Sequence, residues 1–489
     1  GPKPFWLQAP DAAGTIAGEA SPAPGRRRLA EGAEEKVAMP SMSLLDRFSI
    51  AVTGQSARVV FHQLQAVYYN LLTWALVATR LRAIPDRLEP IARVLPPAAE
   101  AAGAAAAVLV LSPGGLERLS LEPLGDAVAT VGYNVKNCER VPGCRSLALL
   151  DPLPADCAVV RVASCSVNYA DVTIRWGLYE SAIRFVGYPI CPGFDFAGHV
   201  ERAGAQSGVR EGDAVFGITF FGAYSSRLLV PGRQLRPLPT LRAPAGGPSA
   251  SVGMNEAAAL PAVAGTALHA LKLAGQWPTP PLVANRAVLI HSAAGGVGSM
   301  LVQMAKILQC HPVVGVVGSP HKVAACKALG ADVVIDKSSE DLWAAAAAAA
   351  PGGFAAVFDA NGVSTLSQSY ASLAQTGTLV IYGFHTNLPS AASLSPLAWV
   401  RMAAGILRMP RFEPLDLVLA SKAVAGFNLS FFADETALVD AYMEQIVAWV
   451  ESGALAVPSV VAFACADAAK AHTLIQSGKS VGKIVLTPP

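Results

Sequence analysis

The sequence has few charged residues and almost no net charge. Only 15% of its 489 residues are Asp, Glu, Lys or Arg, the formal net charge is +2, and 53% of the residues are hydrophobic. A surface that binds nucleic acid needs an excess of Lys and Arg, so this balance gives no expectation of a nucleic-acid partner. The length predicts two or three domains, and the apolar content is ample for large cores.

Cysteine pairs with metal-ligand spacing are also missing. The eight cysteines include no Cys-x-x-Cys pair. We therefore expect free thiols in a reducing compartment rather than a disulfide framework. No internal repeat, Walker loop or Ser-His-Asp nucleophile motif stands out. The chemistry must be sought in another motif.

The first part of the chain predicts an extension rather than a folded domain. Residues 1–57 are rich in Pro, Gly and Ala, which is typical of a disordered or targeting segment. The chain begins with glycine, so we expect a processed or incomplete start. Residues 59–79 carry no formal charge and are long enough for a membrane span, but polar residues such as His62 and Asn70 interrupt them. A membrane-surface helix, a helix packed on the protein body and a span remain alternatives.

Two further regions of different pattern follow. Residues 104–262 contain short strand-like runs broken by Gly and Pro, typical of an antiparallel or barrel-like sheet. Residues 263–427 alternate apolar strands with helical segments, which predicts a parallel sheet covered on both faces. Residues 428–489 end in a strand-like run that we expect to return to the first domain. Residues 1–103 then form the N-terminal extension, with an apolar helix near 58–82.

A glycine-rich turn is the most informative motif. Residues 287–298 read as an apolar strand, a small-residue turn and a helix. The turn has the form Ala293-x-Gly295-x-x-Gly298, a variant of the dinucleotide fingerprint. Small residues let the backbone approach a pyrophosphate, whose charge then sits at the helix N-terminus. The strand–turn–helix context and the repeats after it favour a bound dinucleotide over a purely structural turn.

The residues after the second strand of this unit indicate which nucleotide is bound. Folds that select NAD place an acid there, about 20 residues beyond the glycines. Here residues 317–322 contain no acid, while Ser319 and Lys322 could bind a 2′-phosphate and Lys337 could add charge. The sequence therefore predicts NADP(H). The alternative is that Lys322 is only a solvated helix residue.

From about residue 105 onward the sequence resembles the medium-chain dehydrogenase/reductase superfamily. The motifs that carry the resemblance are 166–171, 192–198, 212–215, 256–261, 293–298, 329–332 and 482–483. The resemblance implies an α/β protein, with a GroES-like β-rich catalytic domain and a Rossmann-type doubly wound parallel-sheet cofactor domain. Within the superfamily the chain is similar to the zinc-free quinone oxidoreductase group. Segments 398–411 and 424–429 are most similar to the synaptic vesicle membrane protein VAT-1 branch.

The positions of the family's zinc ligands hold residues that do not bind zinc. Asn168 stands where zinc alcohol dehydrogenases have a cysteine, and Phe194-Asp195 replaces their His-Glu pair. Cys138 and Cys144 are too few for the structural zinc lobe. We therefore predict no metal.

The resemblance also implies a set of cofactor-binding residues. They are Asn168, Thr266, Gly295, Gly296, Val297, Gly298, Gly318, Ser319, Lys322, Lys337, Asn361, Gly383, Phe384 and Lys483. Asn168 and Lys483 would lie near the nicotinamide, and the four residues from Gly295 to Gly298 would hold the pyrophosphate. Lys337 departs from the tyrosine common at that position in related reductases.

Without zinc, a substrate carbonyl must be polarised by hydrogen bonds, and the protein must supply position and a proton. Tyr179 and Asn168 are the candidate catalytic residues. Tyr179 matches the tyrosine of enoyl-thioester reductases in the superfamily, and its alternative role is packing in the cleft. Thr173 replaces a second tyrosine of some quinone reductases. Asp171 is a base by type, or else a structural acid on a helix.

These residues predict a zinc-independent, NADPH-dependent reductase of a quinone or an α,β-unsaturated carbonyl, with that small molecule as its partner. The alternative is a membrane-associated or lipid-handling protein that retains a nucleotide fold. We expect the cytoplasm or a membrane surface as its location, with organelle targeting left open. A homodimer is expected from fold analogy alone.

Overall fold

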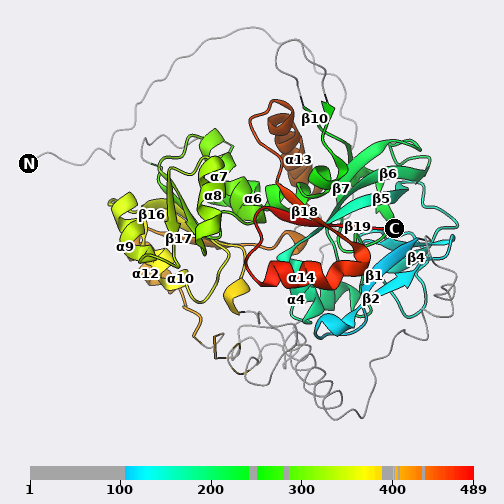
Figure 1. The fold of residues 1–489 in the computed structure, drawn as a ribbon, viewed down its shortest axis with the longest axis horizontal. Helices are drawn as coiled ribbons and strands as arrows, with labels where there is room; N and C mark the ends of the chain where they lie inside the picture. The colour runs from blue at the N-terminus through cyan, green and yellow to red at the C-terminus, as the bar shows by residue number, and fades with distance from the viewer. Residues whose placement is uncertain are drawn as a thin grey trace, which may run out of the picture.

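The computed structural model describes residues 105–241, 250–278, 286–387, 400, 402, 404–405, 408–431 and 435–489. They form a β-rich domain and a parallel-sheet domain that lie side by side (Figure 1). The expectations for residues 1–103 lie outside this part of the chain. In the described part, we find no helix with the length and apolar character that crossing a bilayer requires.

The β-rich domain is built on a sheet of nine strands among the described residues. In order along the sheet these are β4 (Leu147–Leu149), β3 (Val128–Val131), β8 (Arg227–Pro231), β5 (Cys157–Val167), β6 (Asp195–Ala203), β7 (Ala214–Ile218) and β9 (Leu235–Pro237), with β19 (Lys483–Thr487) beside β5 and β18 (Val460–Ala464) beside β19. Strand β5 is rich in valine, which suits a pleated and largely buried surface. Shorter elements of this domain are β1 (Ala106–Val110), β2 (Leu119–Pro123), η2 (Leu116–Arg118), α4 (Tyr169–Arg175), η3 (Ala182–Val186), η4 (Gly232–Gln234), α5 (Met254–Ala258), η8 (Cys465–Asp467) and α14 (Ala468–Gln476).

The second domain has six parallel strands among the described residues. Their spatial order is β14 (Val333–Asp336), β13 (Val313–Val317), β12 (Val288–Ile290), β15 (Phe354–Asp359), β16 (Leu373–Ile381) and β17 (Ala423–Gly426). The order reverses between β12 and β15, and in doubly wound sheets ligands bind outside the strand ends at such a point. The predicted α/β fold class is therefore confirmed.

Helices cover both faces of this sheet, because its strands are apolar on both sides. In β12, Val288 and Ile290 face one buried cluster, while Leu289 faces the other. The helices of this domain are α6 (Pro261–Leu273), α7 (Gly296–Ile307), α8 (Val323–Ala328), α9 (Leu342–Ala349), α10 (Leu366–Ala371), α12 (Pro414–Ala420) and α13 (Thr436–Glu451). Of these, α12 buries none of its residues. The remaining short elements are β10 (Thr240–Leu241), β11 (Ala250–Ser251), η5 (Pro320–Lys322), η6 (His385–Asn387) and η7 (Leu429–Phe431).

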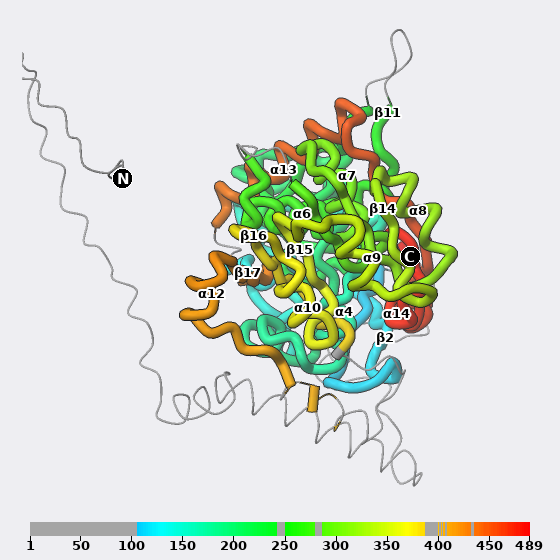
Figure 2. Tube along the Cα trace, turned by 90° about the vertical axis from the view of Figure 1, so that its left-hand side faces the viewer, coloured from blue at the N-terminus to red at the C-terminus, as the bar shows by residue number. Residues whose placement is uncertain are grey.

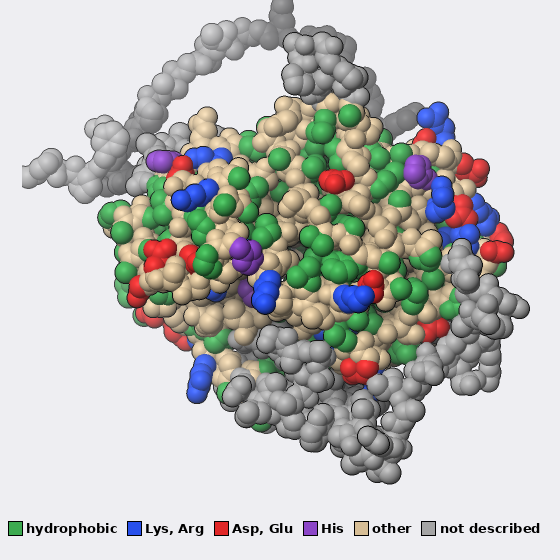
Figure 3. Space-filling model, in the orientation of Figure 1, with side chains coloured by type: hydrophobic (Ala, Val, Ile, Leu, Met, Phe, Trp, Pro, Cys, Tyr) green, Lys and Arg blue, Asp and Glu red, His purple; other side chains and the backbone are tan. Residues whose placement is uncertain are grey.

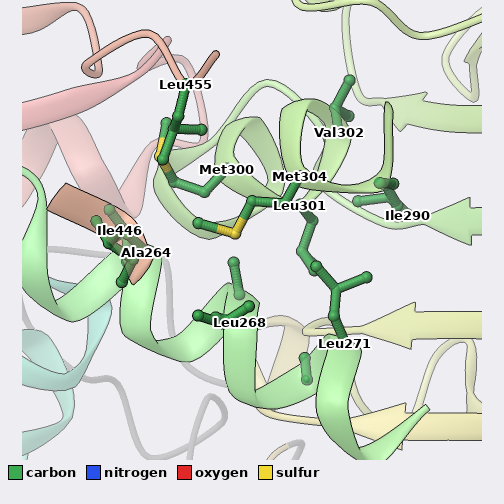
Figure 4. Packing of buried hydrophobic residues seen from close by; sticks show 14 of the residues in the cluster. Ala264, Leu268, Leu271, Ile290, Met300, Leu301, Val302, Met304, Ile446 and Leu455 are labelled. Atoms are coloured by element: carbon green, nitrogen blue, oxygen red, sulfur yellow. The ribbon is translucent and has the colours of Figure 1, made fainter. Parts of the chain in front are cut away.

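The core between α6, α7 and α13 fixes the start of the nucleotide domain. Figure 4 shows Leu268 of α6 facing Met300 and Met304 of α7, with Ile446 of α13 beside Ala264. All five side chains are fully buried. Because α7 starts at the glycine-rich turn, this packing fixes the position of the turn relative to the sheet.

The C-terminal segment joins the two domains. Strand β19 pairs antiparallel with β5 of the β-rich sheet. Just before it, Gly482 forms a bridge with Gly295, and its N–H donates to the carbonyl of Ala294 at 3.0 Å. The same segment passes beside α8 (Figure 2), where the carbonyl of Gly478 accepts a hydrogen bond from Lys322 Nζ at 2.5 Å.

One face of the molecule carries charge of both signs in small groups. On the face shown in Figure 3, Lys and Arg side chains lie among Asp and Glu side chains, separated by apolar and uncharged areas. This face agrees with the small net charge of the sequence.

Truncating Leu268 to alanine tests the importance of the α6–α7 core. We expect Leu268→Ala to lower the free energy of unfolding by about 2–5 kcal/mol, because it removes buried methyl groups and leaves a cavity. Leu419→Ala on α12, where the leucine is 75% exposed, should change it by less than about 0.5 kcal/mol. Urea denaturation followed by tryptophan fluorescence measures both, and equal losses would show that this core is not a main source of stability.

Candidate functional site

A cavity of about 1840 Å³ lies between the two domains. Its lining comes from α4, the ends of β7 and β16, the β12–α7 turn, α13 and the start of β19. Ordinary small-molecule pockets measure roughly 300–1,000 Å³. The cavity therefore has room for a dinucleotide and a second molecule beside it.

The glycine-rich turn forms one wall of this cavity. A Cβ atom on Gly298 would lie 2.2 Å from the carbonyl oxygen of Ser292, so no larger residue fits there. Gly295 is the N-cap of α7 and makes no side-chain capping bond. The N–H groups of the first helical turn have no partners within the helix, and they lie where a pyrophosphate could accept from them. The turn therefore fits the diphosphate of a dinucleotide.

Two lysines lie beyond the ends of β13 and β14. Val317 pairs with Asp336, so Gly318 and Lys337 follow at the same edge of the sheet. A Cβ on Gly318 would be 3.6 Å from Lys337 Cε, and both Lys322 and Lys337 line the cavity. Burial, and then the charge of Lys337, lower the pKa of Lys322. The pair forms a positive region that suits a 2′-phosphate.

Asn168 is held in one orientation by two charged groups. Its amide nitrogen donates to Asp195 Oδ1 at 2.9 Å, and its amide oxygen accepts from Lys483 Nζ at 2.7 Å. Asp195 also accepts from the Ser166 hydroxyl and from the N–H of Ala262 at 3.1 Å. Burial lowers the pKa of Lys483, while the nearby carboxylates of Asp195 and Asp171 oppose that shift.

Lys483 and Asn168 both line the cavity, whereas Asp195 does not. Asp195 therefore positions Asn168 from outside the cavity, while Lys483 contacts it from within the lining. This arrangement could not be predicted from the sequence, because Asp195, Asn168 and Lys483 come from three separate elements. These are β6, the start of α4 and β19.

Asp171 has a structural position. It is fully buried, lies outside the cavity lining, and accepts hydrogen bonds from the N–H groups of Asn168 at 2.7 Å and Gly193 at 2.8 Å. Tyr224 donates a third at 3.1 Å. Burial raises the pKa of Asp171 to about 7. Of the two alternatives for this residue, the geometry favours the structural acid.

Tyr179 faces the cavity with its hydroxyl group held in place. The hydroxyl donates to Asn428 Oδ1 at 3.0 Å and lies 3.1 Å from the Ser430 hydroxyl. The ring makes edge contacts with Phe194 and Phe221, at centroid distances of 5.9 and 6.4 Å. Burial raises the pKa of Tyr179, so the phenol keeps its proton at neutral pH.

Most of the remaining predicted residues also lie at the cavity. Thr266, Gly296, Val297, Gly383 and Phe384 line it. Ser319 and Asn361 do not line it. Ser319 is the N-cap of η5, and Asn361 is buried with its Oδ1 accepting from Ser292 Oγ at 3.3 Å. Asn428 and Ser430 are site residues that the sequence did not indicate, because they contact Tyr179 across about 250 residues.

No three His, Cys, Asp or Glu side chains come together as metal ligands in the described residues. The eight cysteines lie in this part of the chain and are all unpaired, and seven of them are buried. Phe194 packs in an aromatic cluster with Phe221 at 5.3 Å, where a zinc ligand would stand in zinc dehydrogenases.

A β-rich domain and a doubly wound domain, with a glycine-rich turn in the cleft between them, define a two-domain nucleotide-dependent dehydrogenase or reductase. Family models agree. Residues 154–240 match the alcohol dehydrogenase GroES-like domain, and residues 296–440 match the zinc-binding dehydrogenase domain.

Comparison with known proteins gives the family more closely. The chain is 30% identical over 334 residues to the mouse synaptic vesicle membrane protein VAT-1 homolog, covering 67% of this chain and 76% of the relative. It is 28% identical to a quinone oxidoreductase of Pseudomonas aeruginosa, covering 67% of this chain and 90% of the relative. A mycobacterial structure complexed with NADPH is 25% identical, with a TM-score of 0.59, covering 79% of this chain and 100% of that one.

The chain belongs to the medium-chain dehydrogenase/reductase superfamily, in its zinc-free quinone oxidoreductase and VAT-1 branch. The family expected from the sequence is therefore confirmed.

Metal analysis of the purified protein tests the prediction of no metal. We expect less than about 0.1 zinc ion per chain, because Asn168 and Phe194 offer no thiolate or imidazole at the catalytic zinc position. Dialysis against a chelator should leave the melting temperature unchanged. Stoichiometric zinc that survives purification, or unfolding on chelation, would contradict the prediction.

Proposed function

We propose that this protein is a zinc-independent, NADPH-dependent oxidoreductase that reduces a quinone or an α,β-unsaturated carbonyl compound. The observation that carries the proposal is one cavity that holds both a dinucleotide cradle and a positioned phenol. Gly295, Lys322 and Lys337 belong to the first, and Tyr179 to the second. A relative named quinone oxidoreductase and the NADPH complex of a mycobacterial relative support it.

The residues present fit NADPH. The turn at Gly295–Gly298 would hold the diphosphate, and Lys322 with Lys337 would hold the 2′-phosphate. Thr266, Asn168 and Lys483 would border the nicotinamide. When bound, the reduced nicotinamide supplies a hydride.

The chain's own residues supply orientation and a proton. Reduction of an activated C=C bond adds the hydride at the β-carbon and a proton at the α-carbon, whereas a quinone gains the two to become a hydroquinone. Tyr179 is suited to donate this proton or a hydrogen bond once its hydroxyl hydrogen turns from Asn428 Oδ1 to a bound substrate, because its phenol stays protonated and Asn428 and Ser430 hold the hydroxyl oxygen in place. Asp195 and Lys483 keep the Asn168 amide from rotating.

Removing both lysines tests the choice of nucleotide. We expect Lys322→Ala with Lys337→Ala to raise the KM for NADPH at least about tenfold and to change that for NADH by less than about twofold. Each charge-assisted hydrogen bond to a phosphate contributes about 1.5–3 kcal/mol, and NADH has no 2′-phosphate. Steady-state kinetics with both nucleotides measure the effect.

Lys327→Ala is the matched control, because Lys327 is an exposed lysine of α8 outside the cavity lining. It should leave both KM values unchanged. A wild-type protein that binds NADH more tightly than NADPH would overturn the assignment of NADP(H).

Replacing Tyr179 with phenylalanine tests the proton donor. Tyr179→Phe keeps the ring contacts with Phe194 and Phe221 and removes only the hydroxyl group. We expect kcat to fall by about a hundredfold, with little change in NADPH affinity. Turnover assays and fluorescence titration of NADPH separate the two quantities. Full activity of the variant on every good substrate would assign Tyr179 a packing role instead.

A further inference from the structure

One side of the cavity is apolar, and the chemistry proposed above does not use it. It is formed by Tyr382, Phe427, Val439, Tyr442 and Met443, which we call the α13 wall. Val439, Tyr442 and Met443 are spaced three and four residues apart, so they share one face of α13. Tyr382 and Phe427 follow β16 and β17 at the carboxyl edge of the parallel sheet. In Figure 1, α13 lies above the junction of the two domains.

The side chains of the α13 wall are uncharged and pack against one another and against His269. The rings of Tyr382 and Phe427 stack at a centroid distance of 6.4 Å. His269 packs edge-on against Phe427 at 4.5 Å, and its Nδ1 lies 2.7 Å from the Tyr442 hydroxyl. Burial lowers the pKa of His269 to about 4, so the imidazole is neutral near pH 7. Tyr442 and Met443 are almost fully buried, so the apolar surface that the wall offers to the cavity comes mainly from the half-buried Tyr382, Phe427 and Val439.

This wall begins beside the proposed proton donor. Asn428, the residue directly after Phe427, accepts the hydrogen bond from the Tyr179 hydroxyl at 3.0 Å. A substrate whose reacting carbon lies near Tyr179 would therefore extend its substituent along Phe427 and then along α13.

The charged residues near the α13 wall do not favour a charged substituent on the substrate. Arg236 pairs with Asp440, and its Nη1 donates to the carbonyls of Arg233 at 2.7 Å and Leu235 at 2.9 Å. Its charge is thus already compensated within the protein. Arg233 itself is exposed to solvent. A carboxylate at the far end of the substrate would gain little here.

We propose that the α13 wall binds an extended, uncharged apolar substituent of the quinone or enone, so that the protein prefers alkyl-substituted substrates to small ones. This inference rests on the proposed function and names its substrate class. Each methylene group that is fully buried strengthens substrate binding by about fourfold. The preference should therefore grow with chain length until the wall is covered.

A pair of matched substrates tests the preference in the wild-type full chain. With NADPH saturating, kcat/KM is measured for 1,4-benzoquinones that carry a methyl or a decyl group, and for enones with short and long alkyl chains. We expect kcat/KM to be at least about tenfold higher for the long-chain member of each pair. Equal values within each pair would overturn the inference and leave the proposed function intact. No NADPH oxidation with any acceptor would refute both.

Val439→Phe tests whether the α13 wall causes the preference for long-chain substrates. Val439 and Val447 are both half-buried valines of α13 that pack against the same core, but only Val439 lines the cavity. We expect Val439→Phe to lower kcat/KM for the long-chain substrates about tenfold and for the short ones less than twofold. Val447→Phe should change neither. Equal losses for long and short substrates in Val439→Phe would overturn the inference.

Discussion

The whole site depends on the close approach of two backbone segments from different domains. Gly295, at the start of the nucleotide helix, bridges to Gly482, just before the last strand of the β-rich sheet. A Cβ on Gly482 would lie 2.3 Å from the carbonyl oxygen of Ser459, and one on Gly296 would lie 2.9 Å from Lys483 Cδ. Gly482 is thus confined by Ser459, and Gly296 by the Lys483 side chain of the opposing segment. This contact places the dinucleotide cradle directly beside Lys483.

A chain of contacts leads from this bridge to the other residues of the site. Lys483 is the first residue of β19, and its side chain reaches Asn168 at the start of α4. Helix α4 leads to Tyr179, whose hydroxyl is held by Asn428 from the other domain. The contact between Tyr179 and Asn428 joins the two domains, whereas Asn168 and Lys483 both belong to the β-rich domain. The cavity lies where these groups meet the glycine-rich turn of the parallel-sheet domain. The same geometry means that a shift of one domain against the other would disturb cofactor and proton donor together.

The fold was largely predictable because its signals are local. Strand–turn–helix repeats from residue 287 onward predict a parallel sheet, and β12 to β16 form one. The position of the C-terminal strand was also indicated by its apolar pattern, and β19 pairs with β5. The cavity-lining residues on glycine-rich turns were predicted for the same reason. Ser319 was expected at the 2′-phosphate but serves as the N-cap of η5 outside the lining. The contacts of Tyr179 with Asn428 and Ser430, and the α13 wall, were not predictable, because they join residues that no spacing rule connects.

The membrane-associated or lipid-handling alternative depends on residues 58–82, which lie outside the described part of the chain. An apolar wall in the cavity fits a lipophilic substrate without any need for membrane attachment.

The most direct test of the central claim is NADPH oxidation by the purified full chain across ortho-quinones, para-quinones, enones and enoyl thioesters, with product analysis. We expect selective turnover, in which one NADPH is consumed for each hydroquinone or saturated carbonyl compound that is formed. A folded protein that binds NADPH and reduces none of these acceptors would contradict the account.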